Sequence, residues 1–132
     1  VDGSRGMKLP NGLHVKYPNF RTLKSDDGVA SETVYDTRRG RSITDTRIYG
    51  GKVVENVCQA LSRIVIGEQL LAVSRKYKVV MTVHDAIGCI VPSSEADEGL
   101  EYVKDCMKVQ PKWAPDLPLD CEGGTGRSYG DC

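Results

Sequence analysis

Residues 52–76 read KVVENVCQALSRIVIGEQLLAVSRK and contain the clearest helical pattern of the chain. At 100° per residue, most of their apolar side chains fall on one stripe, which consists of Val53, Val54, Val57, Ala60, Leu61, Ile64, Val65 and Leu71. The opposite face is polar in the first half, but it carries Ile66, Leu70 and Val73 in the second half. We therefore expect a helix of roughly 35 Å that is half-exposed where it begins and almost wholly buried where it ends.

A second pattern follows the helix, with an apolar run on each side of a polar pair. Residues 79–83 read VVMTV, residues 87–91 read IGCIV, and His84 and Asp85 stand between the two runs. Both runs are rich in residues that favour strands, and the proline after the second run ends it. The pattern predicts a β-hairpin over about 79–91 with polar side chains at its tip.

Shorter elements are expected around these two. They are a hairpin over 7–17 with Asn11-Gly12 at its turn, a polar loop over 24–32, a strand over 32–36, a basic turn over 38–42, a helix over 94–109, an irregular segment around Pro111, Pro115 and Pro118, and a short strand over 119–122. Asn-Gly suits a tight turn, and Ser94 with Asp97 is typical of a helix start. Because helices and strands mix without βαβ regularity, the sequence predicts an α+β fold, with an antiparallel sheet packed on the two helices.

Composition limits the classes of function. The chain has 132 residues, which suits one domain or part of a larger one, and its formal net charge is zero. Basic residues gather in 38–52 and acidic residues in 93–105. This asymmetry indicates either a face that meets phosphates or simply a solvated loop and a solvated helix face.

The five cysteines are widely spaced, without a C-x-x-C pair, and we expect reduced thiols in a cytoplasmic protein. No signal peptide or membrane-length apolar run is apparent, so we expect no membrane partner. The sequence begins with Val1, and we interpret the 132 residues as a single fragment of a longer protein.

The pair His84-Asp85 is the first candidate for chemistry. A carboxylate displayed at a hairpin tip suits a hard cation such as Mg²⁺, although both side chains could equally satisfy hydrogen bonds of the turn. Other arrangements are weaker. The only other histidine is His14, Cys89 beside His84 fits core packing better than a nucleophile, and no helix follows the glycine-rich run 123–126 as an anion-binding nest would favour.

Several sequence motifs occur in a fixed order along the chain, and together they are more specific than any one of them. Residues 49–61 read YGGKVVENVCQAL, residues 83–87 read VHDAI, and residues 111–119 read PKWAPDLPL. Together with LPNGLHVKYPN at 9–19, they resemble the C-terminus of bacteriophage-type family A DNA polymerases. The resemblance covers about residues 7–129.

The resemblance implies the C-terminal part of a polymerase palm, which would belong to a longer enzyme in the cytoplasm of a bacterial host. In that family two Mg²⁺ ions are held by carboxylates from two separated motifs, and Asp85, with His84 beside it, matches one of them. The other motif and the nucleotide-binding fingers helix lie upstream and do not occur in this sequence. We therefore expect partners in primer–template DNA, a deoxynucleoside triphosphate and the upstream part of the polymerase, and no activity from the fragment alone.

Residues expected to contact DNA follow from the same resemblance and from the basic turn. They are Gln59, Arg63, His84, Arg38, Arg39 and Arg41. Gln59 matches a family glutamine near the primer terminus, and its amide suits minor-groove acceptors that are similar in every base pair. Taken by itself, Gln59 is also compatible with an ordinary solvated side chain.

The chain differs from the family pattern at one position beside Asp85, and this difference is compatible with a non-catalytic function. The family usually has a glutamate after the aspartate, whereas this chain has Ala86. This change, with the missing upstream carboxylate, favours an alternative: a non-catalytic DNA-binding or assembly module with a palm-like fold.

Overall fold

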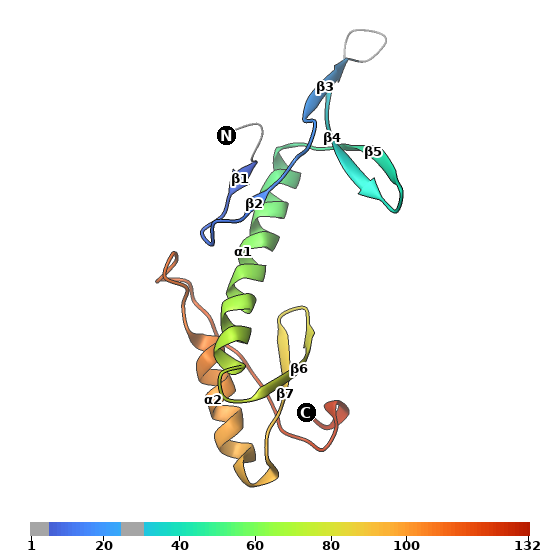
Figure 1. Cartoon of the computed structure of the whole chain (residues 1–132). Coiled ribbons are helices and arrows are strands. Elements are labelled where there is room, and N and C mark those ends of the chain that lie inside the picture. Colours follow the sequence, from blue (N-terminus) through green and yellow to red (C-terminus); the bar gives the residue numbers. More distant parts are fainter. Residues whose placement is uncertain (1–5, 25–30) are drawn as a thin grey trace. The chain divides into compact units, whose positions relative to one another are not determined.

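The computed structural model describes residues 6–24 and 31–132, and over these ranges the chain mixes helices with antiparallel sheets (Figure 1). The α+β class predicted from the sequence is confirmed. The chain divides into two compact units after Ser62, inside the long helix α1 (Gly50–Val73). Within the described ranges the strands form three separate sheets rather than the single sheet expected.

A short hairpin opens the first unit. It consists of β1 (Met7–Lys8) and β2 (His14–Val15), which pair antiparallel. The N–H of Leu9 donates to the carbonyl of Leu13 at 2.7 Å, and the N–H of Gly12 donates to the carbonyl of Leu9 at 2.9 Å. Gly12 has a φ of 83°, which is where the predicted Asn-Gly turn needs a residue without a side chain. The hairpin predicted over 7–17 is therefore confirmed, with shorter strands.

The second sheet of this unit has three strands, which are β3 (Arg21–Lys24), β4 (Ser31–Arg39) and β5 (Ser42–Arg47), with β4 in the middle. The strand predicted over 32–36 is the centre of the longer β4. Gly40, with a φ of 61°, and Arg41 connect β4 to β5, which confirms the basic turn. Most of the polar loop expected over 24–32 lies outside the described residues, and its two ends belong to β3 and β4.

The buried residues of the first unit join the strands to the beginning of α1. Val34 of β4 and Ile48 before α1 are both buried. The rings of Tyr17 and Tyr35 meet edge to face, with their centroids 5.1 Å apart. The Nδ2 of Asn56 donates to the hydroxyl of Tyr17 at 3.0 Å, so the first turns of α1 are tied to the segment after β2.

Helix α1 confirms the long helix predicted over 52–76 and ends slightly earlier. Its buried residues all lie in its C-terminal part: Ile64, Val65, Ile66, Gln69 and Val73. Two members of the predicted apolar stripe are instead exposed, Val54 by 62% and Leu71 by 63%. Leu71 lies about 200° around the helix from Gln69, whose side chain contacts the second helix. The predicted burial of the helix end is therefore right for one face and wrong for Leu71.

The hairpin predicted over 79–91 is also confirmed. Strands β6 (Lys78–Val83) and β7 (Ala86–Ile90) pair antiparallel, with an irregularity in register between Val79 and Met81. Helix α2 (Ala96–Lys108) follows and runs beside the C-terminal part of α1 in Figure 1.

The start of α2 differs from the expectation. The predicted cap by Ser94 is wrong, because residues 93–95 first close a 3₁₀ turn and no side chain caps α2. Close packing fixes the helix instead: a Cβ at Gly99 would lie 2.6 Å from Cγ1 of Val91. A larger residue at this position would require the side chain of Val91 or the helix itself to shift.

A cluster around Lys76 joins the end of α1 to the start of α2. Lys76 Nζ lies 2.6 Å from Glu98 Oε1 and about 5 Å from the ring centroids of Tyr77 and Tyr102. The hydrogen bond between Lys76 and Glu98 raises the pKa of the lysine and lowers the pKa of the carboxyl. The hydroxyl of Tyr102 also donates to the carbonyl of Ala72 at 3.0 Å.

The segment after α2 is irregular, as its prolines predict. Pro111 is buried, and its carbonyl accepts from the N–H of Ala114 at 2.9 Å. The strand predicted over 119–122 is wrong: these residues find no strand partner among the described residues. Asp120 instead pairs with Lys108 of α2, with 3.1 Å between Oδ1 and Nζ.

Candidate functional site

The turn between β6 and β7 consists of His84 and Asp85 alone, because Val83 pairs directly with Ala86. His84 has a φ of 52°, the left-handed conformation that a two-residue hairpin turn requires and that non-glycine residues adopt at a cost. Both side chains are exposed, and neither makes a hydrogen bond with any residue of 6–24 or 31–132. The alternative in which these side chains satisfy the turn therefore has no support among the described residues.

A complete metal site does not form around Asp85. In the described part of the chain no three His, Cys, Asp or Glu side chains come together in a way that would hold a metal ion. Mg²⁺ in proteins is bound through carboxylates at near-octahedral geometry, and Asp85 offers one such group. The residues present thus do not fit a Mg²⁺ site of their own.

The sheet that carries this turn exposes apolar side chains. Val80, Val83 and Ile90 are exposed by 52%, 42% and 61%. A two-stranded sheet by itself is marginally stable in water, and exposed apolar side chains on a sheet commonly mark a surface that meets more protein. These three side chains form apolar surface that the described residues leave exposed.

Cys89 and His84 are not brought together. Cys89 pairs with Val79 near the end of the hairpin that is remote from the turn. Burial raises the pKa of the Cys89 thiol, which favours the uncharged form over a nucleophilic thiolate. A Cys–His nucleophile is therefore not formed here.

Gln59 and Arg63 are exposed residues of α1. The Nε2 of Gln59 donates to Oε1 of Glu55 at 3.2 Å, and both oxygens of Glu55 lie 2.8 Å from Lys52 Nζ. Lys52 thus neutralises the carboxylate beside Gln59, and it does so with its own pKa raised by the hydrogen bond. Among residues 6–24 and 31–132 the second N–H of the Gln59 amide has no acceptor.

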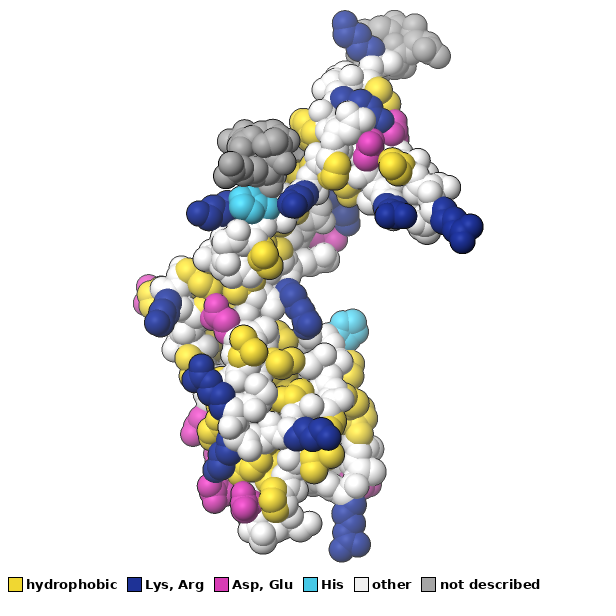
Figure 2. Space-filling view, in the orientation of Figure 1, with side chains coloured by type: hydrophobic (Ala, Val, Ile, Leu, Met, Phe, Trp, Pro, Cys, Tyr) yellow, Lys and Arg dark blue, Asp and Glu magenta, His cyan; other side chains and the backbone are white. Residues whose placement is uncertain are grey.

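The second polar tip is the turn between β4 and β5, where Figure 2 shows a group of basic side chains. Arg38, Arg39 and Arg41 are exposed, and the Nε of Arg38 donates to the carbonyl of Gly40 at 3.2 Å. None of the three has a carboxylate partner in the described ranges, whereas Arg47 of β5 pairs with Glu32 at 3.0 Å. The tip therefore carries positive charge that no described carboxylate neutralises.

Sequence reasoning missed Arg21. Its guanidinium binds Asp36 at 2.8 Å and also binds Asp45, which lies directly opposite Asp36 on the neighbouring strand. The only signal in the sequence is a charged residue inside a short run that favours a strand, which is too common to predict such a clamp.

The fold and these turns define a class: an α+β segment that presents one exposed carboxylate at a hairpin turn and, in its other unit, an arginine-rich turn. Comparison with known proteins gives one particular likeness. Over 120 residues the chain is 32% identical to a DNA polymerase of Bacillus phage SP02.

The aligned region is 89% of this chain but 18% of that polymerase, so the chain spans less than a fifth of its relative. No protein-family model matches the chain, and no solved structure matches it. Among the described residues, neither helix has the length and apolar character needed to cross a membrane.

Proposed function

We propose that the chain is the C-terminal palm segment of a bacteriophage-type family A DNA polymerase and contributes to template-directed DNA synthesis as part of a longer protein. The observation that carries this proposal is the 32% identity to the phage SP02 polymerase over 89% of the chain. The motif order around the long helix and the His84-Asp85 turn supports it. The setting of the intact enzyme would be the cytoplasm of the bacterial host.

Asp85 is the catalytic carboxylate in this proposal. Its side chain is exposed on a two-residue turn, and no described residue makes a hydrogen bond with it. His84 is the other residue of this turn and is assigned a contact with DNA. The Mg²⁺ ions implied by the resemblance require further donors, and these would come from another part of the intact polymerase.

The exposed apolar side chains of the β6–β7 hairpin support a site that is completed by another part of the polymerase. Val80 and Ile90 leave apolar surface that the described chain does not cover. The upstream part of the polymerase is the partner that we assign to this surface.

Two kinds of DNA contact are assigned. The arginine turn, with Arg38, Arg39 and Arg41, would bind backbone phosphates irrespective of sequence. Gln59 and the neighbouring Arg63 would lie along the primer terminus, where an amide donor reaches minor-groove acceptors.

The test is primer extension with primer–template DNA, Mg²⁺ and all four nucleotides. The longer parent protein should extend the primer, and the 132-residue chain should not, because its described residues form no complete metal site. Robust extension by the pure 132-residue chain would overturn the proposal that the chain is an incomplete part of the site.

A non-catalytic DNA-binding or assembly module remains the second candidate, and the specific observation in its favour is Ala86 in place of the usual glutamate. The same assay separates the two functions. A folded parent that binds primer–template but never extends it would identify the module.

A further inference from the structure

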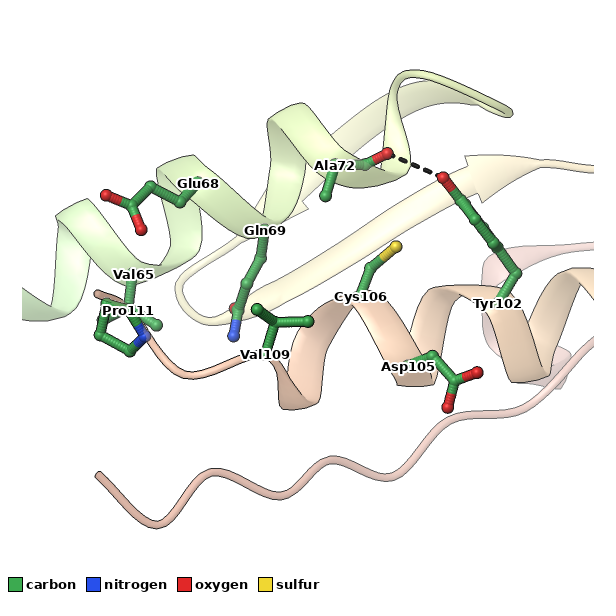
Figure 3. A pocket seen from close by; sticks show the side chains of 9 residues that line it. All are labelled: Val65, Glu68, Gln69, Ala72, Tyr102, Asp105, Cys106, Val109 and Pro111. Carbon is green, nitrogen blue, oxygen red and sulfur yellow. Dashed lines mark hydrogen bonds between the residues drawn. The ribbon is translucent and has the colours of Figure 1, made fainter. Parts of the chain in front are cut away.

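An open cavity of about 360 Å³ lies between α1, α2 and the segment after α2, within the second unit (Figure 3). Val65 and Ala72 contribute to its wall from α1, and Val109 and Pro111 contribute from the segment that follows α2. Val109 is 62% exposed, so this apolar wall continues to the surface. The cavity is thus open to a partner rather than sealed in the core.

The uncharged polar side chains of Gln69 and Tyr102 along the wall already make hydrogen bonds. The side-chain amide of Gln69 donates to the carbonyl of Met107, and the hydroxyl of Tyr102 donates to the carbonyl of Ala72. Both bonds, the second drawn in Figure 3, stay within the protein. An apolar group therefore fits the cavity better than a group that needs hydrogen bonds.

Two carboxylates border the cavity, Glu68 on α1 and Asp105 on α2. Both are exposed, and neither has a cationic partner in the part of the chain that the structure describes. Two other glutamates of α2 do have cationic partners: Glu98 pairs with Lys76, and Glu101 pairs with Lys104. The cavity thus combines an apolar wall with unneutralised negative charge at its border.

We infer that this cavity is a docking site for a cationic protein segment, which inserts one apolar side chain between α1 and α2 and places flanking arginines or lysines beside Glu68 and Asp105. Charge complementarity selects this partner, since an uncharged or acidic segment would leave both carboxylates without a counter-ion. The inference does not depend on the polymerase proposal, because it rests only on the cavity and the two carboxylates at its border.

The test is fluorescence anisotropy of the full 132-residue chain with a short labelled peptide that carries one leucine between arginines. Replacing this leucine by serine should weaken binding by about tenfold or more, because serine removes far less apolar surface from water than leucine does. Glu68→Gln with Asp105→Asn should weaken binding of the leucine peptide by about threefold to tenfold. The matched control, Asp116→Asn with Glu122→Gln, removes two exposed carboxylates that do not border the cavity and should leave affinity nearly unchanged.

A further variant locates the contact. Val109→Ser is at an exposed position and should weaken the leucine peptide but not the serine peptide. Equal binding of the two peptides, or equal loss in the control pair, would show general attraction to acidic surface and overturn the proposal. Self-association of the chain that disappears in Glu68→Gln with Asp105→Asn would identify a second copy as the occupant and would also overturn it. Thermal melts establish that each variant is folded.

Discussion

The side chain of Arg21 connects all three strands of the β3–β4–β5 sheet. Asp36 and Asp45 face each other across β4 and β5, a position where like charges destabilise a sheet. Arg21 of β3 binds both carboxylates, and Asn19 adds a hydrogen bond to Asp36. The hydrogen bond from Arg21 lowers the pKa of Asp36.

This clamp predicts how stability depends on pH. Because the folded pKa of Asp36 lies below its unfolded value, the stabilisation is fully present above the unfolded pKa of about 4 and is lost as pH falls through the folded pKa. Thermal melts from neutral pH downward should show this loss in the native chain. Arg21→Met should have a lower melting temperature at neutral pH, and this temperature should depend less on acid pH. Arg47→Met removes a more exposed ion pair and should change the melting temperature little. An unchanged pH profile in Arg21→Met would contradict the clamp.

Residue-scale prediction from sequence succeeded where the signal was local. The His84-Asp85 turn could be predicted because both strand-forming runs adjoin it. The Arg21 clamp could not, because its partners are 15 and 24 residues away and depend on the pairing of three strands.

Helix α1 is held by its C-terminal part, and Val73 is the fully buried side chain there. Val73→Ala should lower the free energy of unfolding by about 1–3 kcal/mol, from lost apolar burial and the cavity left behind. Leu71→Ala is the matched control on the same helix, since Leu71 is 63% exposed and should change stability by less than about 0.5 kcal/mol. Chemical denaturation measures both, and equal losses would show that the burial of this helix is assigned to the wrong face.

The β4–β5 hairpin makes a separate prediction about DNA. Replacing Arg38, Arg39 and Arg41 by glutamine should weaken binding of duplex DNA by the chain. The slope of log affinity against log salt should fall by about one for each phosphate contact removed. Arg47→Gln is the control, because Arg47 already pairs with Glu32. If neither the affinity nor the slope changes, the arginine turn does not bind phosphates and is simply a solvated loop.

At this scale the sequence predicted the elements with strong apolar periodicity. These elements are α1, the β6–β7 hairpin and α2. It missed β3 and β5, because their polar residues carry no alternating apolar signal and their pairing depends on β4. It also predicted a strand over 119–122, where apolar residues occur but no described strand pairs with them.

At the scale of the whole chain, the alignment covers 18% of the phage SP02 polymerase, and in our proposal the chain is one part of such a longer protein. The first unit presents the basic turn of β4 and β5, and the second unit presents the turn with Asp85. Only the turn with Asp85 is assigned a catalytic role. The β6–β7 hairpin combines an exposed carboxylate with an exposed apolar face, which suits an element that completes its site against further protein.

Single-turnover nucleotide incorporation by the longer parent protein tests this account most directly. Asp85→Ala should reduce incorporation by several orders of magnitude, because a catalytic carboxylate acts chiefly in the transition state. Folding and DNA binding should remain nearly intact, since the exposed side chain makes no hydrogen bond with the described residues. Asp116→Asn, at another exposed carboxylate, should leave incorporation unchanged. Near-normal incorporation by a folded Asp85→Ala parent would contradict the assignment of Asp85 and, with it, the place of this chain in the polymerase active site.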